Sequence, residues 1–146
     1  MNAKRWTMGL LLGLLASATV QAEECRPKIE AAWVREAPPG VPSLAGYLRM
    51  KNVCDAMVQV VDVESLDFGR PMIHRTEHAG GVSRMRPVGE LVVKPGETLR
   101  FEPGSLHLML MRPNRRFVAG EVVRFRLVLA DGRRLYVEAP VRREAP

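Results

Sequence analysis

The chain has 146 residues, of which 47% are apolar and 26% charged, and its formal net charge is +6. This length suits one domain, which can bury about two-thirds of its unfolded surface. The positive excess is mild and no basic residues alternate with aromatic ones, so the composition argues against a nucleic-acid-binding protein.

Residues 1–22 have the features of a cleavable export signal, and residues 23–146 would then form the mature domain. The segment has a basic start, an apolar middle over residues 8–16 and a small-residue cleavage site that ends at Ala22. The apolar part is too short to span a bilayer. Cys25 lies beyond the expected cut, so no cysteine stands where a lipoprotein signal needs one. We therefore expect a soluble periplasmic protein without stable membrane insertion, and loss of the two basic residues lowers the net charge from +6 to +4.

Short stretches with strand character fill the rest of the chain, and helical periodicity is almost absent. The expected strands cover residues 28–34, 44–53, 57–64, 71–77, 82–88, 91–93, 98–101, 105–111, 122–129 and 133–141. From these ranges we expect a fold of about seven to nine short strands, which is typical of a Greek-key β-sandwich or barrel. Gly80-Gly81 and Asp131-Gly132 are expected to turn hairpins. Met50 and Met57 are expected to fill the core, as strand methionines usually do.

Residues 72–111 hold all three histidines and four of the eight methionines of the chain. In the last part of this stretch three leucines alternate with His107, Met109 and Met111. Successive side chains of a strand point to opposite faces. The leucines would therefore enter the core, while the imidazole and the two thioethers share the other face.

A second strand repeats this pattern. Met72, His74 and Thr76 lie two residues apart, so they would share one face, and His78 continues the row. The hairpin that follows would bring His74 opposite the strand that carries Met85. Together the two segments predict a metal site.

The donor types indicate which metal the site would take. Thioether sulfur is a soft donor that suits Cu(I), whereas zinc prefers thiolate or imidazole and calcium or magnesium prefers oxygen. Two imidazoles and two thioethers carry no charge, so they stabilise a monovalent ion better than a divalent one. The cluster therefore predicts Cu(I), with Ag(I) as its mimic.

The spacing of four of these residues resembles a known family. Four residues reproduce the H-x10-M-x21-H-x-M signature of the PCuAC family of periplasmic copper chaperones. They are His74, Met85, His107 and Met109, separated by ten residues, twenty-one residues and one residue. Residues 80–88 and 103–111 look like the two most recognisable strings of that family, and weaker similarity extends from about residue 33 to residue 141.

The resemblance implies a cupredoxin-like β-sandwich in which His74, Met85, His107 and Met109 hold Cu(I). It also implies a non-enzymatic protein that delivers copper toward the CuA centre of cytochrome c oxidase, either directly to the CuA-bearing subunit or through a thiol-bearing assembly factor. The chain departs from the family at Thr76 and at the following histidine, where methionines are common. The auxiliary roles of Met72, Thr76, His78 and Met111 therefore stay open.

Three other functions fit parts of the pattern. A copper-tolerance or buffering protein would use the same site chemistry. A cupredoxin-like electron carrier would need a cysteine thiolate. The two cysteines of an exported chain favour a Cys25–Cys54 disulfide instead. A metal-free interaction module would carry the histidines and methionines incidentally.

Features beside the expected ligands bear on metal exchange. Gly80-Gly81 and Pro103-Gly104 flank the ligand strands, which places the site near one end of the sandwich and partly open to solvent. Five arginines cluster in sequence around the ligands, and such a rim would steer an acidic partner. They are Arg84, Arg86, Arg112, Arg115 and Arg116.

Overall fold

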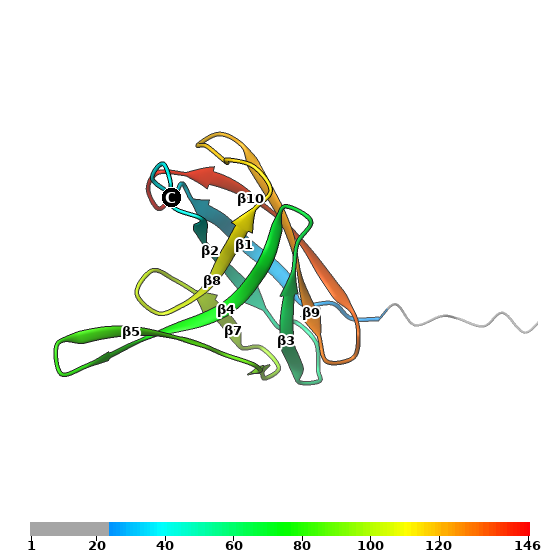
Figure 1. Ribbon diagram of the computed structural model, residues 1–146. Helices are drawn as coiled ribbons and strands as arrows, with labels where there is room; N and C mark the ends of the chain where they lie inside the picture. The colour runs from blue at the N-terminus through cyan, green and yellow to red at the C-terminus, as the bar shows by residue number, and fades with distance from the viewer. Residues whose placement is uncertain (1–23) are drawn as a thin grey trace, which may run out of the picture.

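Ten β-strands form the regular structure of residues 24–146, the part of the chain that the computed structural model describes (Figure 1). They are β1 Lys28–Arg35, β2 Ser43–Lys51, β3 Val58–Glu64, β4 Phe68–Ala79, β5 Val82–Pro87, β6 Leu91–Val93, β7 Thr98–Phe101, β8 Leu106–Pro113, β9 Val122–Leu129 and β10 Arg134–Arg142. The predicted all-β class is confirmed. Each of the ten ranges predicted from the sequence contains a strand, so the expected number of seven to nine was too low. The two shortest strands, β6 and β7, pair with β3 and β2.

Two further expectations concern the N-terminal segment and the membrane. The export signal predicted at residues 1–22 lies outside the described residues. Within those residues, no helix is long and apolar enough to cross a membrane.

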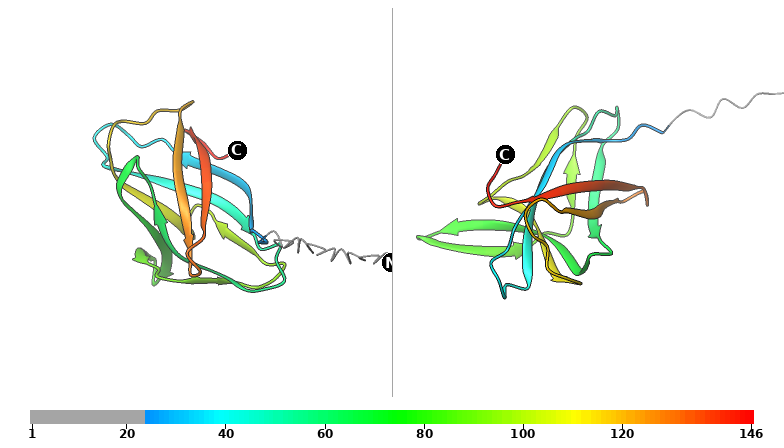
Figure 2. Two further views of the ribbon diagram at one scale, coloured as in Figure 1. Left: turned by 90° about the vertical axis from the view of Figure 1, so that its right-hand side faces the viewer. Right: turned by 90° about the horizontal axis from the view of Figure 1, so that it is seen from above.

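The strands form two layers that join into one continuous sheet. Their order is β5-β4-β8-β2-β1-β10-β9-β3-β6, with β7 beside the second half of β2. Strands β1 and β10 run parallel and connect the layers through the pairs Val34 with Val141 and Arg35 with Arg142. The layers enclose the core between them, as the two views of Figure 2 show.

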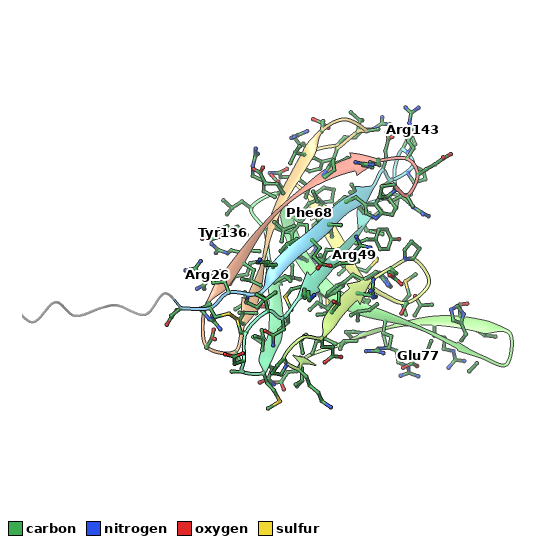
Figure 3. All side chains as sticks on the ribbon, turned by 180° about the vertical axis from the view of Figure 1, so that it is seen from behind. Arg26, Arg49, Phe68, Glu77, Tyr136 and Arg143 are labelled. Atoms are coloured by element: carbon green, nitrogen blue, oxygen red, sulfur yellow. A yellow bond between two sulfur atoms is a disulfide. The ribbon has the colours of Figure 1, made fainter. Side chains whose placement is uncertain are left out.

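The core is built from the inward positions of alternating strands. On β8 the side chains of Leu106, Leu108 and Leu110 are buried, which confirms the predicted leucine face. Phe68 at the start of β4 stacks on Phe117 with ring centroids 5.3 Å apart, and Figure 3 shows Phe68 within the sandwich. Removing such a buried leucine typically costs about 2–5 kcal/mol, so the leucines fix the orientation of β8 firmly. The histidine of this strand must then lie on the opposite face.

A disulfide between Cys25 and Cys54 ties the N-terminal end of the domain to the turn after β2. Asn52, which is fully buried, shapes this turn: its Nδ2 donates to the carbonyl oxygens of Ala56 and Val93, and its Oδ1 accepts from the Cys54 backbone. Met50 fills the core as predicted.

The same prediction is wrong for Met57. This residue belongs to the turn that follows the bridge, before β3 begins, and 68% of it is exposed. Met50 lies on β2, where the alternation of the strand directs its side chain inward, and Met57 has no such constraint.

The β4–β5 hairpin projects beyond the sandwich as an arm, which we define as residues 77–87 (Figure 1; Figure 2, right). The first part of β4 pairs with β8, whereas its last residues pair only with β5. Every residue of β5 is exposed. Figure 3 shows Glu77 on this arm, apart from the bulk of the side chains. Of the four predicted ligands, Met85 therefore lies on the arm and the other three lie on the body of the domain.

Candidate metal centre

Strands β4 and β8 place the two predicted histidine ligands side by side. His74 pairs with His107, and their imidazole ring centroids lie 6.1 Å apart with 29° between the ring planes. The next pair on the same face is Met72 with Met109. Paired residues of antiparallel strands share one face with their Cβ atoms about 4.5–5.5 Å apart. Both imidazoles and two thioethers therefore occupy one small area of the outer face.

The arm adds Met85 to the same face. Met85 pairs with Thr76, which follows His74 by two residues on β4. Because alternate residues of a strand share a face, Met85 projects on the side of the two imidazoles. Met85 is 62% exposed, whereas His107 is only 4% exposed. The four predicted ligands thus range from a buried imidazole on the body to an exposed thioether on the arm.

The hydrogen bond that His107 makes determines which of its nitrogens can bind a metal. Its Nδ1 lies 3.0 Å from the Ser105 carbonyl oxygen. A carbonyl only accepts, so Nδ1 carries the proton and donates, and Nε2 keeps a lone pair. The same carbonyl accepts from the Thr76 backbone N–H at 3.0 Å. The Ser105 carbonyl therefore holds the imidazole and the arm-bearing strand together.

Two imidazole nitrogens at this site are buried without a hydrogen-bond partner. They are Nδ1 of His74 and Nε2 of His107, and they alone among the buried side-chain nitrogen and oxygen atoms of the described residues have no partner. The buried side chain of Asn52, in contrast, satisfies both its oxygen and its nitrogen. An unsatisfied buried polar atom costs about 1–3 kcal/mol. A soft metal ion bound by both lone pairs would remove this cost.

Burial keeps His74 in the neutral form that a metal needs. The pKa of His74 lies below its ordinary 6.5, chiefly because burial disfavours the charged imidazolium, and because His107 and Arg70 add positive charge nearby. The imidazole is thus ready to donate its lone pair near neutral pH.

The donor set does not suit harder metals. In residues 24–146 no three His, Cys, Asp or Glu side chains gather as they would around zinc or calcium. The site instead combines two imidazoles with thioethers from β4, β5 and β8. Such a neutral, soft donor set matches Cu(I) and its mimic Ag(I).

His78 has a structural role in this arrangement. Its Nδ1 lies 2.8 Å from the Ser83 hydroxyl across the arm, and its Nε2 lies 3.2 Å from the Gly104 carbonyl. Both ring nitrogens thus have partners, and the imidazole links the arm to the loop before β8. Met111 lies farther along β8, opposite Arg70 and Ser43, away from the imidazoles.

The sequence analysis missed two features beside the site. The Ser105 carbonyl orients His107, yet no local pattern distinguishes this backbone group. Trp33 and Tyr47 form a buried aromatic pair with centroids 4.6 Å apart, on the face that β2 shares with Met109 through Ala45. The sequence shows one aromatic residue on each of β1 and β2, but their position on the face of the site depends on strand order.

The predicted arginine rim does not form one cluster. Arg84 and Arg86 lie on the arm, but the other three arginines lie at or beyond the far end of β8. There Arg115 binds Glu121 at 2.7 Å and its guanidinium covers the Phe117 ring. A strand rises about 3.3 Å per residue, so the first of the three, Arg112, is roughly 16 Å along β8 from His107. Only the arm arginines flank the candidate ligands.

Comparison with known proteins assigns the family. Residues 28–141 match the family model described as "LpqE-like: Putative lipoprotein LpqE-like". The chain belongs to this family. It is also 27% identical over 136 residues to "Putative lipoprotein Lxx21020" of Leifsonia xyli subsp. xyli, covering 92% of this chain and 81% of the relative.

Solved structures show the same fold. The Cu(I) form of DR1885 from Deinococcus radiodurans is 32% identical, with a TM-score of 0.63 over 78% of this chain and 76% of that one. The copper-bound PCuAC domain from PmoF2 is 22% identical, with a TM-score of 0.65 over 82% of this chain and 93% of that one. The predicted resemblance to the PCuAC family and the predicted cupredoxin-like β-sandwich are both confirmed.

Proposed function

We propose that this family member is an exported, periplasmic Cu(I)-binding metallochaperone, with His74, Met85, His107 and Met109 as the ligands. The observation that carries this proposal is the pair of buried, unpartnered imidazole nitrogens beside thioethers. Two of the similar solved structures are named as copper-bound or Cu(I) forms, which supports the choice of metal.

The position of Met85 supports carriage of the ion more than storage. A carrier must exchange ligands with a recipient, and an exposed thioether on the arm is the ligand that a recipient reaches first. Thioethers also remain available in an oxidising compartment, because they need no deprotonation and form no disulfides. We further propose delivery toward assembly of the CuA centre of cytochrome c oxidase, and the copper-tolerance role is the alternative that uses the same site.

The disulfide argues against the electron-carrier alternative. Blue-copper carriers hold their ion with a cysteine thiolate, and both cysteines of the sequence are engaged in the Cys25–Cys54 bridge. The bridge also occupies the thiol of Cys25, so a lipid thioether at this residue is incompatible with it. The matching family is described as lipoprotein-like, which raises the question of a lipid anchor. We propose that the domain is not anchored through Cys25.

A competition titration of Cu(I) against a chromogenic chelator tests the proposal, with ascorbate as the reductant because thiols bind Cu(I). We expect one equivalent to bind the mature protein tightly. The double variant Met85→Ala, Met109→Ala should bind about ten- to a hundredfold more weakly, because it loses two soft donors. The matched control is Met50→Leu, a core substitution that should leave affinity unchanged. Equal binding by parent and double variant, or none by either, would favour the metal-free interaction module.

Acidification is expected to weaken Cu(I) binding. Only a neutral imidazole binds the ion, so protons compete with copper for the imidazole ligands. Because the pKa of His74 lies below its ordinary 6.5, its protonation begins to compete only below that pH. Affinity should therefore be level at neutral pH and fall below about pH 6. The titration repeated from neutral pH to about pH 4, corrected for protonation of the chelator, measures this. An affinity that stays level throughout would contradict imidazole ligation.

A further inference from the structure

Strand β5 has one open edge along its whole length. It stands at the end of the sheet and pairs only with β4, and no other strand of residues 24–146 pairs with it. All six of its residues are exposed, including the candidate ligand Met85. Edge strands present backbone N–H and C=O groups that can pair with a strand of another protein.

The hydrogen-bond alternation shows which backbone groups face this open edge. The Thr76 N–H of β4 donates toward β8, to Ser105, whereas the Ile73 carbonyl accepts from Val88 on the β5 side. In an antiparallel pair the groups of successive residues point alternately toward and away from the partner strand. Met85 is paired with Thr76, so its own N–H and C=O point away from β4. The same holds for Ser83.

A strand added at this edge would therefore pair directly with Met85. The partner residue opposite Met85 would project on the same face, with its Cβ about 4.5–5.5 Å from that of Met85. A cysteine or methionine at that position would lie beside the candidate copper ligands. Main-chain pairing would thus bring a soft ligand of the recipient to the ion.

The charges of the arm indicate which residues flank that ligand. Arg84 and Arg86 are next to Met85 and project on the opposite face, together with Arg75 of β4. One carboxylate, Glu77, accompanies these three guanidinium groups, and it binds Arg86 at 2.9 Å. A partner with Asp or Glu on each side of its soft ligand would place these carboxylates opposite Arg84 and Arg86.

The same charges disfavour a second copy of this chain as the occupant. A two-fold antiparallel pairing centred on Met85 would set Arg84 of each copy opposite Arg86 of the other. Like charges directly opposite on neighbouring strands are destabilising. The edge therefore favours an acidic partner over self-association.

We propose that β5 is the docking edge for the recipient of copper, and that this recipient contributes an extended segment with Cys or Met between acidic residues. The inference rests on the proposed copper-carrier function. As the recipient strand pairs with β5, a bond forms between Cu(I) and the recipient sulfur and the bond to the Met85 sulfur breaks. Copper stays in the monovalent state, and a recipient thiol releases its proton to water.

The test uses the copper-free protein and two synthetic peptides, so that it does not depend on metal binding. One peptide has a central methionine between Asp and Glu within a threonine- and valine-rich strand sequence, and the other has lysine in place of both acids. We expect the acidic peptide to slow hydrogen exchange and shift the NMR signals of the Ser83 and Met85 amides, while the Arg84 and Arg86 amides change little. The lysine peptide should bind about tenfold more weakly or worse.

Matched variants separate main-chain pairing from side-chain effects. Ser83→Pro removes an outward N–H without removing a bond to β4, whereas Ser83→Ala keeps this N–H and loses only the hydroxyl that contacts His78. We expect loss of peptide binding in the first and retention in the second. If Ser83→Pro fails to fold, the double variant Arg84→Glu, Arg86→Glu decides, because it should reverse the preference toward the lysine peptide.

Three results would overturn the proposal. They are unchanged Ser83 and Met85 amides at millimolar peptide, shifts confined to β6 at the other edge, and equal binding of the two peptides. The copper titration is independent of these three results, because it measures metal affinity and not peptide binding. A protein that binds Cu(I) but not the peptide would keep the carrier function without this docking edge, and one that binds the peptide but not Cu(I) would retain the edge without the carrier function.

Discussion

Replacing His107 by asparagine is expected to weaken Cu(I) binding by at least about a hundredfold. Asparagine can still donate a hydrogen bond to the Ser105 carbonyl, as the imidazole Nδ1 does. It has no counterpart of Nε2, the buried nitrogen that lacks a partner in the structure. The substitution therefore removes the proposed donor atom while it keeps the contact that holds the side chain in place. The chelator competition measures the affinity, and thermal unfolding of the copper-free protein checks the fold.

His78→Asn is the control for this variant. It makes the same chemical change on the same face of the sheet, but at a residue whose nitrogens both have partners within the protein. We expect one equivalent of Cu(I) to remain bound, with a smaller loss of affinity because the arm is less firmly linked to the body. If the His78 variant loses as much affinity as the His107 variant, the ligand set is centred on the arm and His107 has been assigned wrongly.

The alternation of residues predicted one half of the site, because a strand has a period of two. Leu106, Leu108 and Leu110 had to be buried, and this alone set the histidine and methionines of β8 on the outer face. The alternation of residues could not predict which strand pairs with β8. The pairing of His74 with His107 joins residues far apart in the chain, and only the spacing shared with the PCuAC family indicated it.

The errors of the sequence analysis have related causes. Arg112, Arg115 and Arg116 are near the ligands in sequence, but an extended strand carries them to the other end of the domain. Met57 was placed in the core because residues 57–64 have strand character, and the strand begins only at Val58. The Ser105 carbonyl was missed because any residue carries such a group. Turn geometry and strand order determined these features, and neither follows from a local pattern.

Removing the disulfide is expected to destabilise the domain strongly and leave copper binding intact. The bridge joins cysteines 29 residues apart in the sequence. In the chain-entropy model, a closed loop of this length contributes roughly 3–4 kcal/mol to the free energy of unfolding. For a domain of this size, Cys25→Ala with Cys54→Ala should therefore lower the melting temperature by about 10 °C. Calorimetry of the copper-free parent and variant measures the difference.

Copper binding should survive this change because the bridge lies away from the site. Cys54 follows the end of β2 that pairs with β7, whereas the site adjoins the end that pairs with β8. At a temperature where both proteins are folded, Cu(I) affinities of parent and double cysteine variant should agree within about twofold. Single cysteine variants would leave a thiol that binds Cu(I) itself, so the double variant is the informative one. Two results would contradict a site of thioethers and imidazoles: loss of copper from the folded variant, or intense visible colour of the parent with Cu(II). Either result would indicate a cysteine ligand and would favour the electron carrier with a thiolate.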